Sequence, residues 1–168
     1  MDQIEKPVVL IVDDEESFRD LLADIVEECG FLPLPAENGQ EALNLLDLGN
    51  IAAIVSDLIM PNIDGLKLLE MVKQKKPTLP FIVLTGHWTK DSSLTALRLG
   101  AFDFIEKPFT LPCIQDVIKK AVLLHKAQES ALAMLLTKFG KLTKNAGKDD
   151  LRGLEVLADL MAKRKIAS

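Results

Sequence analysis

Residues 8–14 read VVLIVDD, and this stretch decides the fold. Its first five residues are all β-branched or aliphatic, and two aspartates follow them directly. An apolar run of this length without alternation is typical of a strand that is buried on both faces of a parallel sheet. Runs of the same kind recur as IAAIV at 51–55 and FIVL at 81–84, with a weaker one, FDFI, at 102–105. The sequence therefore predicts four buried strands.

Apolar residues at helical spacing fill the intervals between these runs. Gly30 and Gly100 end two of the predicted helices, and Pro77 stops a third. The spacing predicts five helices with these apolar residues: Phe18, Leu21, Leu22, Ile25 and Val26; Ala42, Leu43, Leu45 and Leu46; Leu66, Leu69, Met71 and Val72; Leu94 and Leu97; Ile114, Val117, Ile118, Ala121 and Leu124.

The segment FLPLP at 31–35 stands where one more strand would fall. Its two prolines cannot donate hydrogen bonds to a ladder, so the segment is either an edge strand or no strand. The whole pattern is a strand–helix unit repeated five times. It predicts an α/β fold with a parallel sheet, helices on both faces and right-handed crossovers. Ligands of such sheets bind outside the carboxyl ends of the strands.

Composition narrows the class of protein. The chain has 168 residues, of which 48% are hydrophobic and 27% charged, so we expect one globular domain and a few tens of further residues. No apolar run reaches the roughly 20 residues of a membrane span, and the first residues do not resemble a signal peptide. Cys29 and Cys113 form no metal-binding pattern. We therefore expect a cytoplasmic protein with reduced thiols and no membrane contact.

Charge is distributed unevenly along the chain. Residues 1–124 carry 11 basic and 20 acidic side chains, whereas residues 125–168 carry 9 basic and 5 acidic ones. The excess of negative charge in the first part disfavours binding to nucleic acid. The last forty or so residues are a segment of a different kind.

Several charged or polar side chains follow the predicted strands. Asp13 and Asp14 follow the first strand, Asp57 the run at 51–55, Thr85 the run at 81–84, and Lys107 the last. Parallel strands bring these ends to one edge of the sheet. Clustered carboxylates need a cation, and oxygen ligands alone favour a hard ion such as Mg²⁺. A cation, a lysine and a hydroxyl around one carboxylate are suited to binding a phosphoryl group, and a carboxylate can itself become an acyl phosphate.

The pieces VVLIVDDEESFRDLL, ENGQEAL, VSDLIMPNIDGLKLL, FIVLTG and AFDFIEKPF occur in this order within residues 6–125. Together they resemble the receiver domain of bacterial two-component response regulators, the CheY-like family. The resemblance implies a flavodoxin-like sheet with strand order 2-1-3-4-5. It also implies a cytoplasmic phosphoacceptor of a phosphorelay rather than a turnover enzyme, with only slow self-catalysed phosphorylation and dephosphorylation. Its donor would be a histidine kinase or a phosphotransfer protein.

The resemblance also assigns roles to residues. Asp57 is implied as the phosphoacceptor. Asp14 and Asp57 would bind Mg²⁺ directly together with the backbone carbonyl of Ile59, and Asp13 would bind it through water. Lys107 would pair with the acyl phosphate.

Three further residues resemble the family's conformational switch. Thr85 would donate a hydrogen bond to the phosphoryl group after rotating inward. Phe104 takes the place of the aromatic switch residue, which is often Tyr in the family, so the hydroxyl contact is missing here. Pro108 resembles the proline whose preceding peptide bond is usually cis.

Simpler interpretations exist for the same residues. Asp13 and Asp14 precede a helix and could act only as its N-terminal cap, and Thr85 beside Gly86 could belong to an ordinary turn. A different class of protein, the Mg²⁺-dependent phosphohydrolases, also uses an aspartate at a strand end. Those enzymes normally carry a second Asp two residues after the nucleophile, and here that position is Ile59.

We assign residues 1–126 to the receiver domain and residues 127–168 to a helical extension. In the extension Leu132, Leu135, Phe139 and Leu142 step by three, four and three residues, and Leu151, Leu154, Ala158 and Met161 repeat these steps. Between them lies a polar break at 143–148. The pattern predicts a two-helix hairpin.

Three interpretations of the hairpin compete. It could bind a downstream protein or a second copy of the chain. It could be a minimal DNA-binding appendage. It could also be the remnant of a longer linker, or a helical cap without an output of its own. We favour the first, because the basic residues are scattered and no helix-turn-helix is recognisable. We therefore expect output by protein–protein interaction or dimerisation, with nucleic acid disfavoured as a partner.

Overall fold

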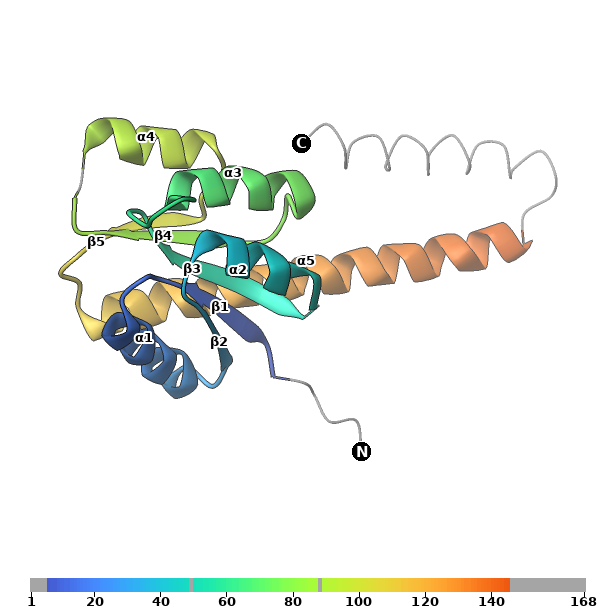
Figure 1. Ribbon diagram of the computed structural model, residues 1–168. Coiled ribbons are helices and arrows are strands. Elements are labelled where there is room, and N and C mark those ends of the chain that lie inside the picture. Colours follow the sequence, from blue (N-terminus) through green and yellow to red (C-terminus); the bar gives the residue numbers. More distant parts are fainter. Residues whose placement is uncertain (1–5, 49, 88, 146–168) are drawn as a thin grey trace. The chain divides into compact units, whose positions relative to one another are not determined.

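The computed structural model describes residues 6–48, 50–87 and 89–145 (Figure 1). The chain divides into two units between residues 125 and 126, and the sheet lies in the first. Within the described residues, no helix is both long and apolar enough to cross a membrane.

The first unit contains one five-stranded sheet in which all pairs are parallel. Its order is β2-β1-β3-β4-β5, as the family resemblance implied. The strands are β1 Val8–Val12, β2 Leu32–Ala36, β3 Ile51–Asp57, β4 Phe81–Thr85 and β5 Asp103–Glu106. The predicted α/β fold class is confirmed.

The three central strands are buried along their whole length, apart from the first residue of β1. This burial explains their uninterrupted apolar sequences, because both faces of the sheet are covered by helices. The proline-containing segment forms the edge strand β2, which pairs only with β1. An edge position tolerates Pro33 and Pro35, since one side of the strand has no ladder to complete.

Five helices alternate with the strands and cover both faces (Figure 1). α1 and α5 pack on one face of the sheet, and α2, α3 and α4 pack on the other. Their bounds are α1 Glu16–Glu28, α2 Gly39–Leu45 followed by a 3₁₀ turn at Leu46–Leu48, α3 Gly65–Lys75, α4 Lys90–Arg98 and α5 Leu111–Asn145. α1 and α4 end just before Gly30 and Gly100, as predicted, and both glycines have φ +86°.

One predicted apolar stripe, on α4, does not face the core, and the stripe on α5 departs from its prediction at one residue. On α4, Leu94 and Leu97 are 50% and 58% exposed, and the only buried residue of that helix is Ala96. On α5 the first four residues of the predicted stripe are buried and the fifth, Leu124, is exposed, while Val122 and His125 are buried as well. The spacing of apolar residues alone does not fix which face of a helix is buried.

α5 is longer than the predicted fifth helix. It runs without interruption to Asn145, so the helix predicted from Ser130 onward is part of α5. The second helix of the predicted hairpin, with Leu151 to Met161, lies outside the described residues. The domain boundaries 1–126 and 127–168 therefore stay a prediction.

Candidate functional site

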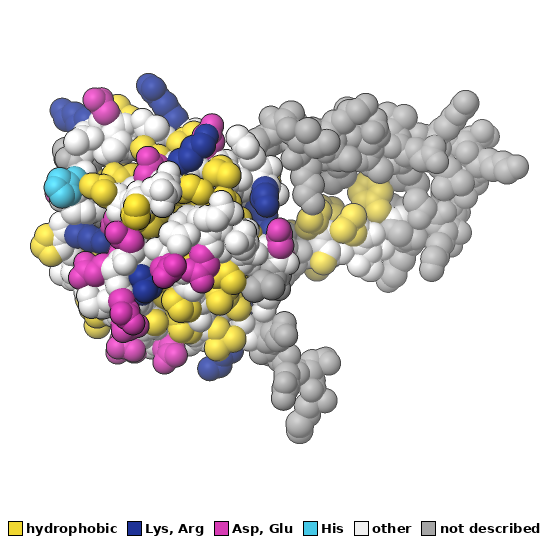
Figure 2. Space-filling model, viewed as in Figure 1, with side chains coloured by type: hydrophobic (Ala, Val, Ile, Leu, Met, Phe, Trp, Pro, Cys, Tyr) yellow, Lys and Arg dark blue, Asp and Glu magenta, His cyan; other side chains and the backbone are white. Residues whose placement is uncertain are grey.

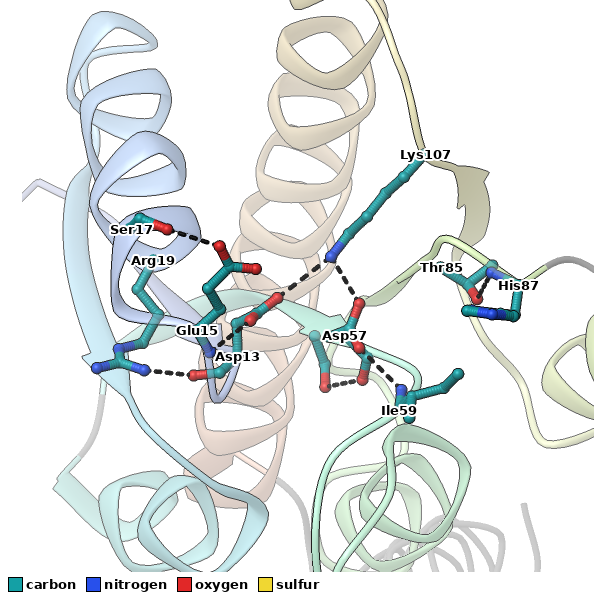
Figure 3. A network of polar contacts seen from close by, with 10 residues as sticks. Asp13, Glu15, Ser17, Arg19, Asp57, Ile59, Thr85, His87 and Lys107 are labelled. Carbon is teal, nitrogen blue, oxygen red and sulfur yellow. Dashed lines mark hydrogen bonds and ion pairs between the residues drawn. The ribbon is translucent and has the colours of Figure 1, made fainter.

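The carboxyl ends of four strands place polar side chains at one edge of the sheet (Figure 3). Asp13 directly follows β1, and Asp57 is the last residue of β3. Thr85 is the last residue of β4, and Lys107 directly follows β5. Asp13, Asp57 and Lys107 contact one another at this edge although they are far apart in the chain, whereas the Thr85 side chain at the same edge accepts a hydrogen bond from His87.

Lys107 joins the two buried carboxylates. Its Nζ lies 2.7 Å from Oδ1 of Asp57 and 3.3 Å from Oδ2 of Asp13 (Figure 3). The side chains of Asp57 and Asp13 are only 12% and 4% exposed, and that of Lys107 is 23% exposed. Partial burial strengthens such charge-assisted contacts, because little solvent screens them.

The loop after β3 fixes the carboxylate of Asp57. The backbone N–H of Ile59 donates to Oδ2 of Asp57 at 2.9 Å, which leaves Oδ1 for Lys107. The loop closes through a hydrogen bond from the Gly65 N–H to the carbonyl of Leu58 at 2.8 Å. A Cβ on Gly65 would lie 2.3 Å from the backbone oxygen of Asp57, so only glycine fits there without displacement.

The loop after β1 fixes Asp13. Its Oδ1 accepts a hydrogen bond from the Glu15 N–H at 2.9 Å, and its backbone carbonyl accepts one from Nη1 of Arg19 at 2.7 Å. Burial raises the pKa of Asp13 above its ordinary value, and this effect outweighs the hydrogen bond and the charge of Lys107. Asp14 is exposed. The N-cap of α1 is Glu15, so neither aspartate caps that helix.

The predicted switch residues lie next to this edge. Thr85 is fully buried, and its Oγ1 accepts a hydrogen bond from the N–H of His87 at 3.0 Å (Figure 3). Phe104 is partly buried and packs against the core on the α2, α3 and α4 side. The bond between Lys107 and Pro108 is cis, as the resemblance implied.

Sequence reasoning missed two aromatic residues at the site. Nζ of Lys107 lies 3.7 Å from the ring centroid of Phe18, which is on α1. The ring of Phe18 in turn meets that of Phe109 edge-on, with centroids 6.1 Å apart. The spacing identified Phe18 only as part of the apolar stripe of α1. Its place in the first turn after the two aspartates is the signal that could have drawn attention to it.

The residues predicted to bind Mg²⁺ supply only oxygen atoms, as that ion requires. They do not form a closed cluster: throughout the described ranges, no three His, Cys, Asp or Glu side chains are grouped so that they could hold a metal ion. Exposed acidic side chains also gather around the start of α1, at the lower left of Figure 2, and include Asp14, Glu15, Glu16 and Asp20. This surface charge attracts cations toward the same edge.

Residues 9–119 match the model of the response regulator receiver domain. The match covers well over half of the chain, and the chain therefore belongs to this family. Receiver domains are phosphoacceptor modules of two-component signal transduction rather than classical enzymes, so the predicted family and signalling class are confirmed.

Individual relatives give the same result. An NtrX-like response regulator of Rickettsia felis is 40% identical over 115 residues, which are 67% of this chain and 24% of the relative. The DNA-binding transcriptional regulator NtrC of Escherichia coli K12 is 33% identical over 126 residues, 75% of this chain and 27% of NtrC. The chain thus spans about a quarter of the length of these relatives.

A solved structure supports the fold independently. The beryllofluoride-activated receiver domain dimer of NtrC4 is 36% identical, with a TM-score of 0.67, over 70% of this chain and 98% of that one.

Proposed function

We propose that this chain is a response regulator in which Asp57 accepts a phosphoryl group from a histidine kinase or a phosphotransfer protein. One observation carries the proposal. A partly buried lysine, Lys107, at the carboxyl edge of the sheet contacts both Asp57, at 2.7 Å, and Asp13, at 3.3 Å. An ammonium in this position balances the negative charge of a phosphoryl group bound to Asp57.

The reaction transfers a phosphoryl group from the imidazole of the donor to the carboxylate of Asp57. A carboxylate oxygen of Asp57 attacks phosphorus, the bond between phosphorus and the donor nitrogen breaks, and the donor imidazole keeps the electron pair and takes up a proton. The product is an acyl phosphate on Asp57. The Ile59 N–H and the ammonium of Lys107 hold the two oxygens of the carboxylate before the attack. Slow hydrolysis by water would reverse the modification without making the protein a turnover enzyme.

The donor atoms at this edge are oxygens, the type of ligand that Mg²⁺ prefers. Asp13, Asp14, Asp57 and the backbone carbonyl of Ile59 would hold it, and all four groups offer oxygen atoms. The bound ion would neutralise charge on the phosphoryl oxygens. The exposed carboxylate of Asp14 and the surrounding acidic surface leave a route by which the ion can enter (Figure 2).

Thr85 and Phe104 would convert the modification into a change of shape. The hydroxyl of Thr85 now accepts from the His87 N–H, and it would turn toward the phosphoryl group and donate to it. Phe104 on β5 would repack in response. The face formed by α4, β5 and α5 would then change, which matches the way that a local charge is transmitted in phosphorylation switches.

We assign the output to the part of α5 beyond residue 125. Leu132, Leu135 and Leu136 are 43%, 45% and 64% exposed there, and Met134 is 63% exposed. Apolar side chains this exposed favour a partner surface. Self-association or a downstream protein fits this surface, and the solved NtrC4 receiver is itself a dimer.

Intact-mass spectrometry tests the phosphoacceptor assignment. The full chain is incubated with Mg²⁺ and a small acyl-phosphate donor, and we expect a mass gain of one phosphoryl group. Asp57→Asn should abolish the gain. Asp20→Asn, which removes an exposed carboxylate of α1, is the matched control and should keep it. A gain that persists in Asp57→Asn would contradict the assignment.

The output assignment has its own test. Sedimentation of the full chain is compared with and without phosphorylation, in the wild type and in Leu136→Glu. We expect association that Leu136→Glu removes and that Ser130→Glu, an equally charged change at an exposed polar position of α5, retains. Equal association of all three proteins would show that this surface does not carry the contact.

A further inference from the structure

The ammonium of Lys107 has a third neighbour besides the two carboxylates. Its Nζ lies over the face of the Phe18 ring, 3.7 Å from the centroid. Lys107 belongs to the loop after β5, whereas Phe18 belongs to α1, so the contact joins two elements that flank the site. An ammonium carries three N–H groups. The ammonium of Lys107 donates one hydrogen bond to Asp57 and one to Asp13. The electron-rich face of the Phe18 ring provides a further favourable contact with the same charge.

The ring itself is held in place. Phe18 is partly buried and packs against the core between the sheet, α1 and α5. The ring of Phe109 meets it edge-on, with an interplanar angle of 66° and centroids 6.1 Å apart. Phe109 is two residues from Lys107, so the aromatic pair ties the lysine loop to α1. A ring fixed in this way can define where a flexible lysine places its charge.

Lysine needs such support because its four-carbon stem rotates freely and its ammonium hydrates strongly. The hydrogen bond to Asp57 depends on a carboxylate oxygen, and that oxygen changes chemically when it is phosphorylated. The contact with Phe18 does not involve a reacting atom. It can therefore hold the ammonium at the site before, during and after phosphoryl transfer.

We propose that Phe18 is a positioning residue, which holds the ammonium of Lys107 beside Asp57 for phosphoryl transfer. The inference rests on the proposed function, because it presumes that Asp57 is the phosphoacceptor. Phe18 touches no reacting group, so its effect on the reaction passes through Lys107.

The test separates positioning from ordinary packing. Phe18→Leu keeps an apolar side chain and removes the ring, whereas Phe18→Tyr restores a ring. Phe31→Leu is the matched control, because Phe31 is also a partly buried phenylalanine packed against the same core and follows α1 at its other end. If Phe18→Leu does not fold, Phe18→Met replaces it.

Two readouts are used on the full chain. The first is the rate at which a small acyl phosphate modifies Asp57 at saturating Mg²⁺. We expect Phe18→Leu to lower this rate roughly three- to tenfold, in the range of a cation–π contact. Phe18→Tyr and Phe31→Leu should stay within about twofold of the wild type. The second readout is NMR of the Lys107 methylene next to Nζ, whose ring-current shift should vanish in Phe18→Leu and persist in Phe18→Tyr.

The outcomes are distinguishable. If the wild type shows the ring-current shift but Asp57 is never phosphorylated, the proposed function fails and the role of Phe18 in transfer fails with it. If the wild type is phosphorylated and Phe18→Leu reacts at the same rate, only the role of Phe18 is overturned. A Phe18→Tyr variant as slow as Phe18→Leu, or an equal loss in Phe31→Leu, would overturn it as well.

Discussion

Gly65 gives the sharpest stability prediction, because its neighbours are rigid backbone atoms. A Cβ at this position would lie 2.3 Å from the carbonyl oxygen of Asp57 and 2.9 Å from Cα of Leu58. Ordinary contacts of this kind are about 3.5 Å, so α3 and the end of β3 must separate by on the order of 1 Å. Neither atom belongs to a flexible side chain that could turn away.

We expect Gly65→Ala to destabilise the protein by about 1–3 kcal/mol, the usual cost of overpacking. Two other effects are smaller. The φ angle of Gly65 is not positive, so alanine adds no backbone strain there. Alanine is also the better helix former, by at most about 1 kcal/mol, and this gain only partly offsets the clash.

Urea denaturation followed by circular dichroism measures the effect, with Gly86→Ala as the matched control. A Cβ on Gly86 would meet nothing within 4 Å, and its φ is not positive either. That variant should stay within about 1 kcal/mol of the wild type. A drop in melting temperature of roughly 2–12 °C should accompany Gly65→Ala. Equal stability of the two variants would refute the steric argument.

Three further predictions use the same measurement. Burial raises the pKa of Asp13, so just above pH 3.8 the folded chain holds a proton that the unfolded chain has already lost. Without divalent ions, the stability of Asp13→Asn relative to the wild type should therefore increase as the pH rises above 3.8. A difference in stability that stays constant with pH would contradict this. Burial lowers the pKa of Lys73, whose Nζ donates to the carbonyls of Pro77 and Leu79. The stability of the wild type relative to Lys73→Met should therefore increase as the pH rises toward 10.5. A decrease in that relative stability would contradict the prediction. The Asn38 side chain caps α2, so Asn38→Ala should cost about 1 kcal/mol, and a neutral result would show that the cap does not stabilise the fold.

The sheet could be predicted from sequence because its central strands are apolar throughout. Runs such as VVLIV and FIVL identify buried parallel strands locally. The two prolines of the 31–35 segment left only an edge strand or no strand, and the structure has the edge strand β2. The rotation of α4 could not be predicted in this way. Leu94 and Leu97 share a helical face, but the contacts that decide which face is buried come from residues far away in the sequence.

The proximity of Asp13, Asp57 and Lys107 could be predicted from sequence for a similar reason. Asp13, Asp57 and Lys107 each follow an apolar run, and a parallel sheet brings such positions together. The exact partners did not follow, because they depend on side-chain reach: Lys107 spans Asp57 and Asp13 and also lies over Phe18. A residue on an apolar stripe gives no sign in the sequence that it also supports a charge.

The length of α5 was another feature that spacing did not give. The spacing gave a fifth helix as far as Leu124 and a further helix from Ser130, and in the structure both belong to one continuous helix that ends at Asn145.

The central claim is that Asp57 becomes an acyl phosphate, and mapping the modified residue tests it most directly. The phosphorylated full chain is treated with borohydride, which reduces an aspartyl phosphate to homoserine, and is then digested and sequenced by mass spectrometry. We predict homoserine at position 57 in the wild type, formed only when Mg²⁺ and the phosphoryl donor are both present. Homoserine at Asp13, Asp14 or any other aspartate, with position 57 unchanged, would contradict the claim.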